Sequence, residues 1–189
     1  MIRVVAGDFR GRRLHTVAGG ATRPTADRAR EGLFGWLGPQ VVGASMLDLF
    51  AGTGAVGIEA LSRGARHVTF LERAANAIGV LRRNLEELEL LLRARVLTTD
   101  ARRGLARLRR EGVRFDLVFA DPPYDGDWAQ RLAREPTLVD VLAPAGILVV
   151  ERARSAQGLD GDEILGLRDS RSYGSSSFDW YEPTEVRGE

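Results

Sequence analysis

The chain has 189 residues, 44% of them hydrophobic and 28% charged, which is typical of a globular protein with one full-sized core. It contains no cysteine, which excludes disulfides, thiolate metal sites, iron–sulfur clusters and cysteine nucleophiles. The two histidines, His15 and His67, are too far apart in sequence to suggest a metal site, and no apolar run is long enough to cross a bilayer. We therefore expect a cytoplasmic protein without a metal, which works through carboxylates, backbone groups and a cofactor.

The net charge of +1 is unevenly distributed along the chain. Residues 1–30 carry seven arginines against Asp8 and Asp27, a balance of +5, which leaves −4 for the remaining residues. A basic arm on a nearly neutral body is typical of proteins that bind a polyanion. The sequence therefore predicts phosphate contacts from this arm.

The first part of the chain, before residue 45, is expected to form a hairpin and one helix. Residues 2–6 and 12–17 predict a hairpin, and the apolar periodicity of residues 25–37 predicts a helix that ends at Gly38 and Pro39. Beyond residue 45, buried strands alternate with helices and two further strands follow. The expected strands are 46–50, 67–72, 94–98, 115–120 and 146–151. The first expected helix ends near Gly64, and the others span 74–92, 101–110 and 128–142. The last two strands are expected within 163–182. In the helix at 74–92, Leu88 and Leu92 are expected on the buried side. This alternation predicts an α/β fold with a doubly wound parallel sheet.

A glycine-rich turn follows the first of these strands. Gly52, Gly54 and Gly57 satisfy the pattern G-x-G-x-x-G between a strand and a helix, where glycine allows a tight turn and close approach to a ligand. Glu72 ends the next strand, where a carboxylate can accept hydrogen bonds from ribose hydroxyls. These features fit a nicotinamide dinucleotide nearly as well as S-adenosylmethionine.

Two aspartates favour S-adenosylmethionine. Asp48 precedes the glycines and could hold a cationic amino group, and Asp100 ends the third strand, where it could accept from an adenine amine. The alternative is that both aspartates only cap helices.

The segment Asp-Pro-Pro-Tyr, residues 121–124, follows the fourth strand and indicates the reaction. An exocyclic base amine is a poor nucleophile because its lone pair is delocalised into the ring. The Asp121 carboxylate and the Pro122 carbonyl could accept its two N–H bonds and stabilise the charge that grows on nitrogen. Pro123 stiffens the loop, and Tyr124 offers a ring on which an unstacked base can rest. The alternative is a turn that only ends a strand.

With these motifs, the sequence resembles the RsmD family of guanine-N2 methyltransferases that act on 16S ribosomal RNA. The resemblance covers nearly the whole chain and rests on RVVAGDFRGRRL (3–14), RPTADRAREGLFGWL (23–37), LDLFAGTGAVGIEALSRGA (47–65), DPPY (121–124) and YG…WYE (173–182). It implies a class I S-adenosylmethionine-dependent methyltransferase fold, a Rossmann-like sheet of seven strands with the last antiparallel. It also implies a small hairpin and helix extension at residues 1–40 that binds RNA, and a catalytic domain at 41–189.

The resemblance also implies site residues. For the cofactor S-adenosyl-L-methionine they are Thr25, Asp48, Phe50, Ala51, Gly52, Thr53, Gly54, Glu72, Arg73, Asp100 and Ala101. Residues Asp121, Pro122, Pro123 and Tyr124 would hold the guanine, and the RNA would contact Arg10, Arg12, Arg13, Arg23 and Arg28. The implied partner is 16S ribosomal RNA within an assembled small subunit.

Other functions share parts of this pattern. A NAD-dependent oxidoreductase explains the glycines but gives Asp-Pro-Pro-Tyr no role. Methylation of protein glutamine poses the same lone-pair problem, although such enzymes resemble Asn-Pro-Pro-Tyr and position 121 is Asp. Methylation of another RNA or DNA base amine is compatible with the catalytic loop itself. The sequence departs from the family at Asp179 and Trp180, where apolar residues are usual, so the register of the last strand is left open.

Overall fold

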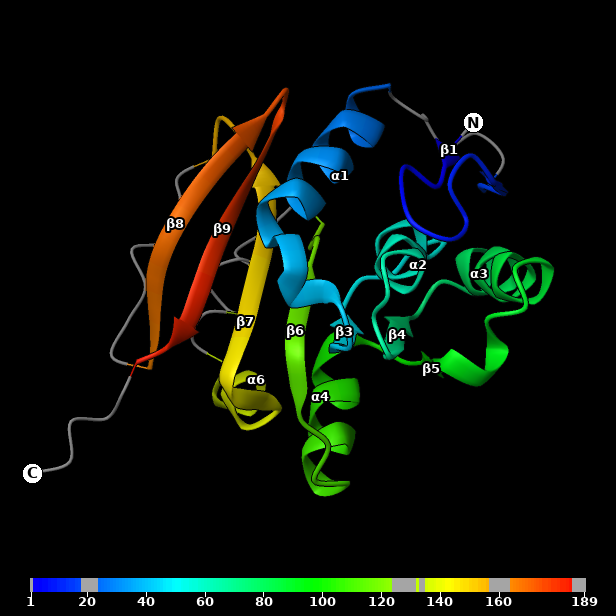
Figure 1. Cartoon of the computed structure of the whole chain (residues 1–189). Helices are drawn as coiled ribbons and strands as arrows, with labels where there is room; N and C mark the ends of the chain where they lie inside the picture. Colours follow the sequence, from blue (N-terminus) through cyan, green and yellow to red (C-terminus); the bar gives the residue numbers. More distant parts are fainter. Residues whose placement is uncertain (1, 18–23, 124–131, 133–134, 157–163, 185–189) are drawn as a thin grey trace, which may run out of the picture.

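The computed structural model of the chain describes residues 2–17, 24–123, 132, 135–156 and 164–184. Its centre is a seven-stranded sheet in the order β5-β4-β3-β6-β7-β9-β8 (Figure 1). The strands are β3 Ser45–Asp48, β4 His67–Glu72, β5 Ala94–Thr98, β6 Phe115–Ala120, β7 Leu142–Ala153, β8 Leu165–Tyr173 and β9 Ser176–Pro183. The pairs from β5 through β7 are parallel, whereas β9 is antiparallel to both β7 and β8. The expected class I methyltransferase sheet, with its last strand antiparallel, is confirmed.

Helices cover both faces of the sheet (Figure 1). They are α1 Pro24–Leu37, α2 Ala55–Ser62, α3 Ala75–Glu87, α4 Ala101–Arg110 and α6 Pro136–Asp140, with short 3-10 turns η1 Gly38–Val41 and η2 Leu91–Arg93. Side chains of α1, α2 and α3 share one apolar core, and those of α4 and α6 share a second. Successive residues of a strand point to opposite faces, so Phe70 lies in the first core and Leu71 in the second. Both strand faces are therefore buried, which explains the continuous apolar runs in the sequence.

The amino-terminal arm, residues 2–17, packs over α2 and α3 (Figure 1). Its hairpin is shorter than expected, with β1 Ile2–Arg3 paired to β2 Arg13–Leu14. Two side chains of α2 hold the intervening loop. The buried Glu59 carboxylate accepts hydrogen bonds from the backbone N–H groups of Val5 and Ala6, at 2.7 and 3.0 Å. The Ser62 hydroxyl donates to the carbonyl of Ala6 and accepts from the N–H of Phe9. The loop backbone is thus fixed by side chains rather than by a longer ladder.

The predicted helix at 74–92 is too long. Helix α3 ends at Glu87, and Glu89 adopts a left-handed conformation with φ of 56°. The N–H of Leu90 then bonds to the carbonyl of Leu85, a closing bond typical of helix ends. Leu88 is buried as expected, but Leu92 lies beyond the reversal and is 98% exposed. The placement of Leu92 on the buried side is therefore wrong.

Three other boundaries also differ from expectation. Helix α6 covers only Pro136–Asp140, whereas residues 128–131 and 133–134 of the predicted helix lie outside the described residues. Strand β7 begins at Leu142, before Pro144, so the chain is already extended where a helix end was expected. The first strand of the sheet ends at Asp48 rather than at residue 50, because the glycine turn begins there.

The last strand has a definite register. Val150 pairs with Asp179 and Val149 with Trp180 across β7 and β9. The buried Asp179 carboxylate accepts from the Arg152 guanidinium at 2.7 Å and from the Ser170 hydroxyl at 2.6 Å. Trp180 packs against Trp36 of α1, with ring centroids 5.0 Å apart. Both residues that depart from the family pattern therefore have partners inside the fold.

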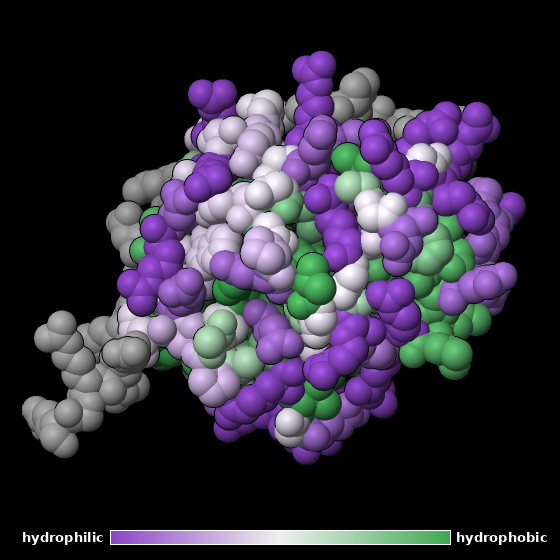
Figure 2. Space-filling model, in the orientation of Figure 1, coloured by the Kyte–Doolittle hydropathy of each residue, from purple (hydrophilic) through white to green (hydrophobic). Residues whose placement is uncertain are grey.

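Hydrophilic side chains cover most of the face in Figure 2, and an apolar patch lies at its right-hand edge. The most exposed large apolar residues include Leu91 and Leu92 of the turn between α3 and β5. In the part of the chain that the structure describes, no helix combines the length and apolar character that a membrane span requires.

Candidate active site

The glycine turn after β3 is built by left-handed backbone and close packing. Gly52 and Gly54 have φ values of 54° and 86°, which favour glycine because it lacks a Cβ. At Gly57 the restriction is steric, since a Cβ there would lie 2.2 Å from the Phe70 ring of β4. The turn and the start of α2 therefore need these three glycines for different reasons.

Glu72 organises this turn from the end of β4. Its Oε2 accepts a hydrogen bond from the N–H of Gly52 at 2.8 Å. Its Oε1 accepts from the N–H groups of Arg73 and Ala74, both at 2.7 Å. A carboxylate has about four acceptor positions. The three bonds leave Glu72 able to accept a ribose hydroxyl, so the expected role fits the geometry.

Asp48 ends β3 and lies beneath the turn. Only 1% of the residue is exposed, and its Oδ2 accepts from the N–H of Gly57 at 3.1 Å. Burial is the largest influence and raises the pKa of Asp48 to about 7; the Gly57 bond opposes this and the charge of Glu72 adds to it. A buried carboxyl group with so raised a pKa favours a cationic ligand beside it, because a positive charge would offset the cost of burying the negative one.

A pocket of about 260 Å³ opens at the carboxyl ends of β3, β4, β5 and β6. It is lined by Leu49, Phe50, Leu71, Glu72, Arg73, Thr99, Asp100, Ala101, Asp121 and Pro123. Strands of a parallel sheet end at one edge, which is where ligands of open α/β folds bind. Six of the residues assigned by resemblance to the cofactor or the guanine line this pocket beside Glu72: Phe50, Arg73, Asp100, Ala101, Asp121 and Pro123.

Not every assigned residue lines this pocket. Of the described residues, Asp48 and the backbone of residues 51–54 form the turn beside and beneath it rather than its wall. Asp100 also caps α4, because its Oδ1 accepts from the N–H of Arg103 at 3.0 Å. The capping alternative for Asp100 is thus correct but does not exclude a ligand role. Thr25 is the second residue of α1, where its side chain is not described, and Tyr124 lies outside the described residues.

Asp121 follows β6 and faces this pocket. Although the side chain has an exposed part, the surrounding protein removes much of its water. That desolvation, followed by the charges of Glu151 and Asp48, raises the pKa of Asp121 to about 8. Pro122 is buried beside it and Pro123 borders the pocket. The carboxyl group is therefore held on a stiff segment in an anionic environment.

Glu151 is a site residue that the sequence analysis missed. Ala120 pairs with Val150 in parallel register, so Asp121 and Glu151 are the next residues along neighbouring strands. Burial raises the pKa of Glu151, and a hydrogen bond from the Ser176 side chain opposes that shift. Only the acid at the end of the run GILVVE hinted at this position, and its contact with Asp121 depends on the strand register. Carboxyl groups thus gather at or near the carboxyl ends of four strands: Asp48, Glu72, Asp121 and Glu151.

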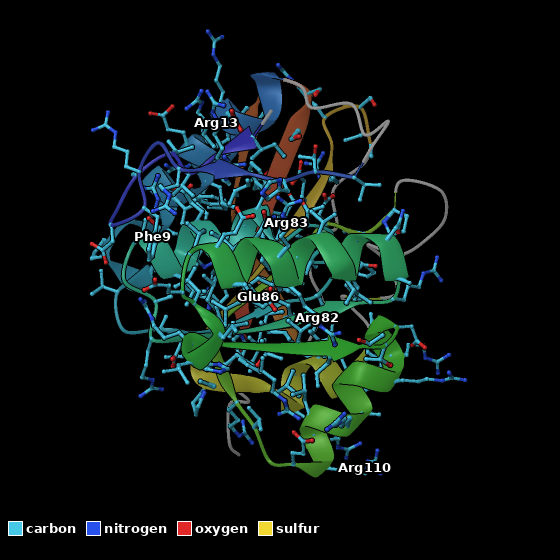
Figure 3. The ribbon with its side chains drawn as sticks, turned by 90° about the vertical axis from the view of Figure 1, so that its right-hand side faces the viewer. Phe9, Arg13, Arg82, Arg83, Glu86 and Arg110 are labelled. Carbon is cyan, nitrogen blue, oxygen red and sulfur yellow. The ribbon has the colours of Figure 1, made fainter. Side chains whose placement is uncertain are left out.

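The residues assigned to RNA lie apart from the pocket. Arg10, Arg12 and Arg13 are exposed on the arm, and Arg28 is exposed on α1. Arg23 lies outside the described residues. Arg13 of the arm and Arg83 of α3 are on the same side of the molecule (Figure 3). A basic surface therefore adjoins the domain that carries the carboxyl cluster.

One amino-terminal arginine has a different position. Arg30 is only 5% exposed and lies 3.0 Å from Asp27, with its Nε 3.5 Å from the Glu59 carboxylate. It also donates to the carbonyl of Arg3. The charge count of the sequence therefore includes an arginine that holds the arm in place.

The chain matches known proteins over almost all of its length. A family model described as conserved hypothetical protein 95 matches residues 2–182. The Haemophilus influenzae protein named ribosomal RNA small subunit methyltransferase D is 35% identical over 150 residues, which is 79% of this chain and 78% of that protein. A Bacillus subtilis protein, YlbH, provisionally named an rRNA methyltransferase, is 42% identical over 82% of this chain and 85% of that protein.

Solved structures agree with these sequence matches. The Thermus thermophilus hypothetical protein TTHA0928 has a TM-score of 0.81 and 29% identity, and the match covers 96% of this chain and 99% of that one. Because both chains are covered almost completely, the arm as well as the sheet has a counterpart of the same architecture.

Proposed function

The chain belongs to the family of ribosomal RNA small subunit methyltransferase D, and on that premise we propose that it methylates the exocyclic N2 amine of a guanine in 16S ribosomal RNA. S-adenosylmethionine is the methyl donor. The observation that carries the proposal is the position of Asp121, which faces the pocket beside Glu72 and Asp100 at one sheet edge. The carboxyl group that would hold the amine and those that would hold the donor therefore share one cavity.

The residues of the glycine turn and the pocket fit this donor. Bound there, S-adenosylmethionine would supply a methyl group on a positively charged sulfur. Glu72 has acceptor capacity for ribose hydroxyls, and Asp100 lies across the pocket, where an adenine amine could donate to it. Asp48 lies beneath the turn without an arginine partner among the described residues, and a cation beside it would favour its ionised form. We assign it to the cationic amino group.

Asp121 makes the amine reactive by accepting its N–H bond. Asp121 and the carbonyl of Pro122 would together accept hydrogen bonds from both N–H groups of the amine. The nitrogen lone pair would then point at the methyl group. When the nitrogen gains the methyl group it must release one proton, and the Asp121 carboxylate is placed to accept it. The raised pKa of Asp121 makes its ionised form a stronger base than an ordinary aspartate.

The arm supplies the contacts to RNA in this proposal. Its exposed arginines offer bidentate phosphate contacts, and residues 1–40 act as the RNA-binding extension of a catalytic domain at 41–189. A base must leave its stack to reach a pocket at a sheet edge. We assign the substrate to the assembled small subunit, where RNA shape can present one guanine to the pocket.

The test is methyl transfer with substrates compared side by side. Small subunits from a strain without the modification, naked 16S ribosomal RNA, DNA and ribosomal proteins are each incubated with the chain and methyl-labelled S-adenosylmethionine. We expect label in the RNA of small subunits, and labelling about a hundredfold to a thousandfold slower when Asp121→Ala replaces the wild-type chain. Label in DNA or protein would overturn the substrate while keeping the donor, and label in naked RNA alone would overturn the assembled subunit as substrate.

A further inference from the structure

Asn84 of α3 connects two parts of the molecule that the proposed function uses separately. Its Oδ1 accepts a hydrogen bond from the N–H of His15 at 2.8 Å, and its Nδ2 donates to the carbonyl of His15 at 3.1 Å. The same Nδ2 donates to the carbonyl of Thr53 at 3.0 Å. His15 belongs to the arm, and Thr53 lies between the two left-handed glycines of the cofactor turn.

The environment makes this connection specific. Asn84 is 1% exposed, so water cannot replace a partner that moves away. A buried amide that loses a hydrogen bond is left unsatisfied, which is unfavourable because nothing then compensates the loss of its hydration. Both donor hydrogens and the acceptor oxygen of the side chain are used, which leaves a single amide orientation that satisfies all three bonds. A shift of the arm at His15 is therefore opposed by the bond from Asn84 to Thr53. A shift of the cofactor turn at Thr53 is likewise opposed by the bonds between Asn84 and His15.

The arm end of this connection lies at a basic groove. A cavity of about 350 Å³ between the arm and α3 is lined by Asn84 together with Arg3, Gly11, Arg12, Arg13, Glu87 and Leu88. Arg12 donates to the carbonyl of Glu87 at 3.1 Å, so a charged side chain of the arm is already held against α3. Figure 3 shows the arm above α3, with Arg13 on the arm. An RNA phosphate in this groove would contact residues that adjoin Asn84.

We propose that Asn84 is a positioning residue that couples RNA binding at the arm to cofactor binding at the glycine turn. The inference rests on the proposed function, because it takes the arm as the RNA-binding element. RNA that fixes the arm would fix the carbonyl of Thr53 through one amide, and the turn would then lose less freedom when the cofactor binds. Because coupling between two binding sites is reciprocal, the cofactor would tighten RNA binding by the same factor.

The chain offers a matched control for this link. Ser62 also holds the arm by two hydrogen bonds, to the carbonyl of Ala6 and from the N–H of Phe9, and it is 2% exposed. Both of these hydrogen bonds of the Ser62 hydroxyl are made to the arm. Ser62→Ala therefore loosens the arm without touching the cofactor turn, whereas Asn84→Ala removes the arm bonds and the bond to Thr53 together.

The experiment measures the affinity for S-adenosylhomocysteine by equilibrium dialysis, with and without saturating small subunits that lack the modification. In the wild-type chain we expect subunits to tighten binding by about fivefold or more. In Asn84→Ala this factor should fall to about one, while Ser62→Ala should keep most of it. Asn84→Ser, which retains a hydroxyl in the buried position, serves if the alanine variant does not fold.

The outcomes separate the inference from the proposed function. Equal coupling in the wild-type chain and the Asn84 variants would overturn the inference, as would equal loss in Asn84→Ala and Ser62→Ala. Subunits that bind the wild-type chain without changing its S-adenosylhomocysteine affinity would overturn the inference alone. A wild-type chain that binds no subunits would overturn the inference and the RNA-binding role of the arm together.

Discussion

Desolvated carboxyl groups occur in two regions of this molecule, in opposite electrostatic settings. At the sheet edge, the buried Asp48 and the partly exposed Asp121 have no arginine partner among the described residues, and desolvation by the surrounding protein raises the pKa of each. Beneath the arm, the fully buried Glu59 lies 2.7 Å from Arg63 and 3.5 Å from Arg30. The carboxylate beneath the arm therefore stabilises the fold, because it is paired with arginines. The carboxyl groups at the sheet edge lack such partners, which lowers stability but leaves them able to bind a ligand.

The largest expected effect is on catalysis, at Asp121. Asp121→Ala removes the carboxylate that accepts the amine N–H, and we expect the rate of methyl transfer to fall by about a hundredfold to a thousandfold. Because the variant also removes a desolvated acid, the free energy of unfolding should not fall at neutral pH. Single-turnover methyl transfer measures the rate, and denaturant unfolding measures the free energy of unfolding. A variant with at least half of the wild-type rate would remove Asp121 from the mechanism.

The largest effect on stability is expected at Glu59. Glu59→Ala leaves the buried Arg30 without that partner and the N–H groups of Val5 and Ala6 without their acceptor. Breaking a buried ion pair by removing one member costs about 3–5 kcal/mol of unfolding free energy. Urea unfolding measures this loss. A loss below about 1 kcal/mol would show that the arm is not anchored by this carboxylate.

Asp48 should respond in the opposite direction. Its pKa is about 7 in the folded chain against 3.8 ordinarily, so the unfolded chain releases the proton first as the pH rises. Folding stability is therefore lost between roughly pH 4 and pH 7 through this group. Asp48→Asn removes that loss and should stabilise the chain by on the order of 3 kcal/mol at pH 8, with little effect at pH 4. The same variant should bind S-adenosylhomocysteine more weakly.

Unfolding curves of wild type and Asp48→Asn at both pH values test this sign. If the variant were less stable than the wild type at pH 8, the carboxyl group would be a structural anchor like Glu59, and the contrast between the two regions would not hold.

A smaller effect is expected in the pH profile. The ionised form of Asp121 accepts the amine N–H best, so the wild-type rate should rise with pH up to about 8. After burial, the charge of Glu151 is the largest cause of this raised pKa. Glu151→Gln removes that charge and should move the rise to lower pH. If the pH midpoint of the rate were the same in Glu151→Gln as in the wild type, whatever the maximal rate, the charge of Glu151 would not influence the pKa of Asp121.

The smallest effect is expected at a surface ion pair. Glu111 pairs with Arg95 at 2.7 Å and with Arg107 at 2.8 Å, and hydrogen bonds from these arginines lower its pKa to about 2. Solvent screens such pairs strongly. Glu111→Gln should leave methyl transfer unchanged and the melting temperature nearly so. A drop in melting temperature as large as that of Glu59→Ala would mean that burial does not decide how much a carboxylate ion pair contributes to stability.

Much of the site could be predicted because parallel strands bring their ends together. Glu72, Asp100 and Asp121 are far apart in sequence, yet each follows an apolar strand, and that is sufficient to place them at one edge. The left-handed turn at Gly52 and Gly54 was likewise predictable, since the glycine spacing reflects a steric requirement of the backbone itself.

The remainder depends on information that local sequence lacks. Glu151 meets Asp121 only because β6 and β7 pair in one register, which a single strand does not specify. Arg30 looks like the exposed arginines of the arm until its burial against Glu59 is known. Leu92 continues the apolar periodicity of α3, but the left-handed Glu89 ends the helix before it.

The central claim is that the carboxyl groups at the sheet edge direct a methyl group to the N2 amine of guanine. Small subunits methylated by the wild-type chain can be digested to nucleosides, and the methylated nucleoside identified by mass spectrometry against standards. The account predicts N2-methylguanosine, formed about a hundredfold to a thousandfold more slowly by Asp121→Ala. A methyl group on a ring nitrogen of guanine or on a ribose would contradict it, because neither acceptor is an amine whose two N–H bonds are held beside Asp121. A methyl group on the N6 amine of adenosine would keep the amine chemistry but contradict guanine as the target.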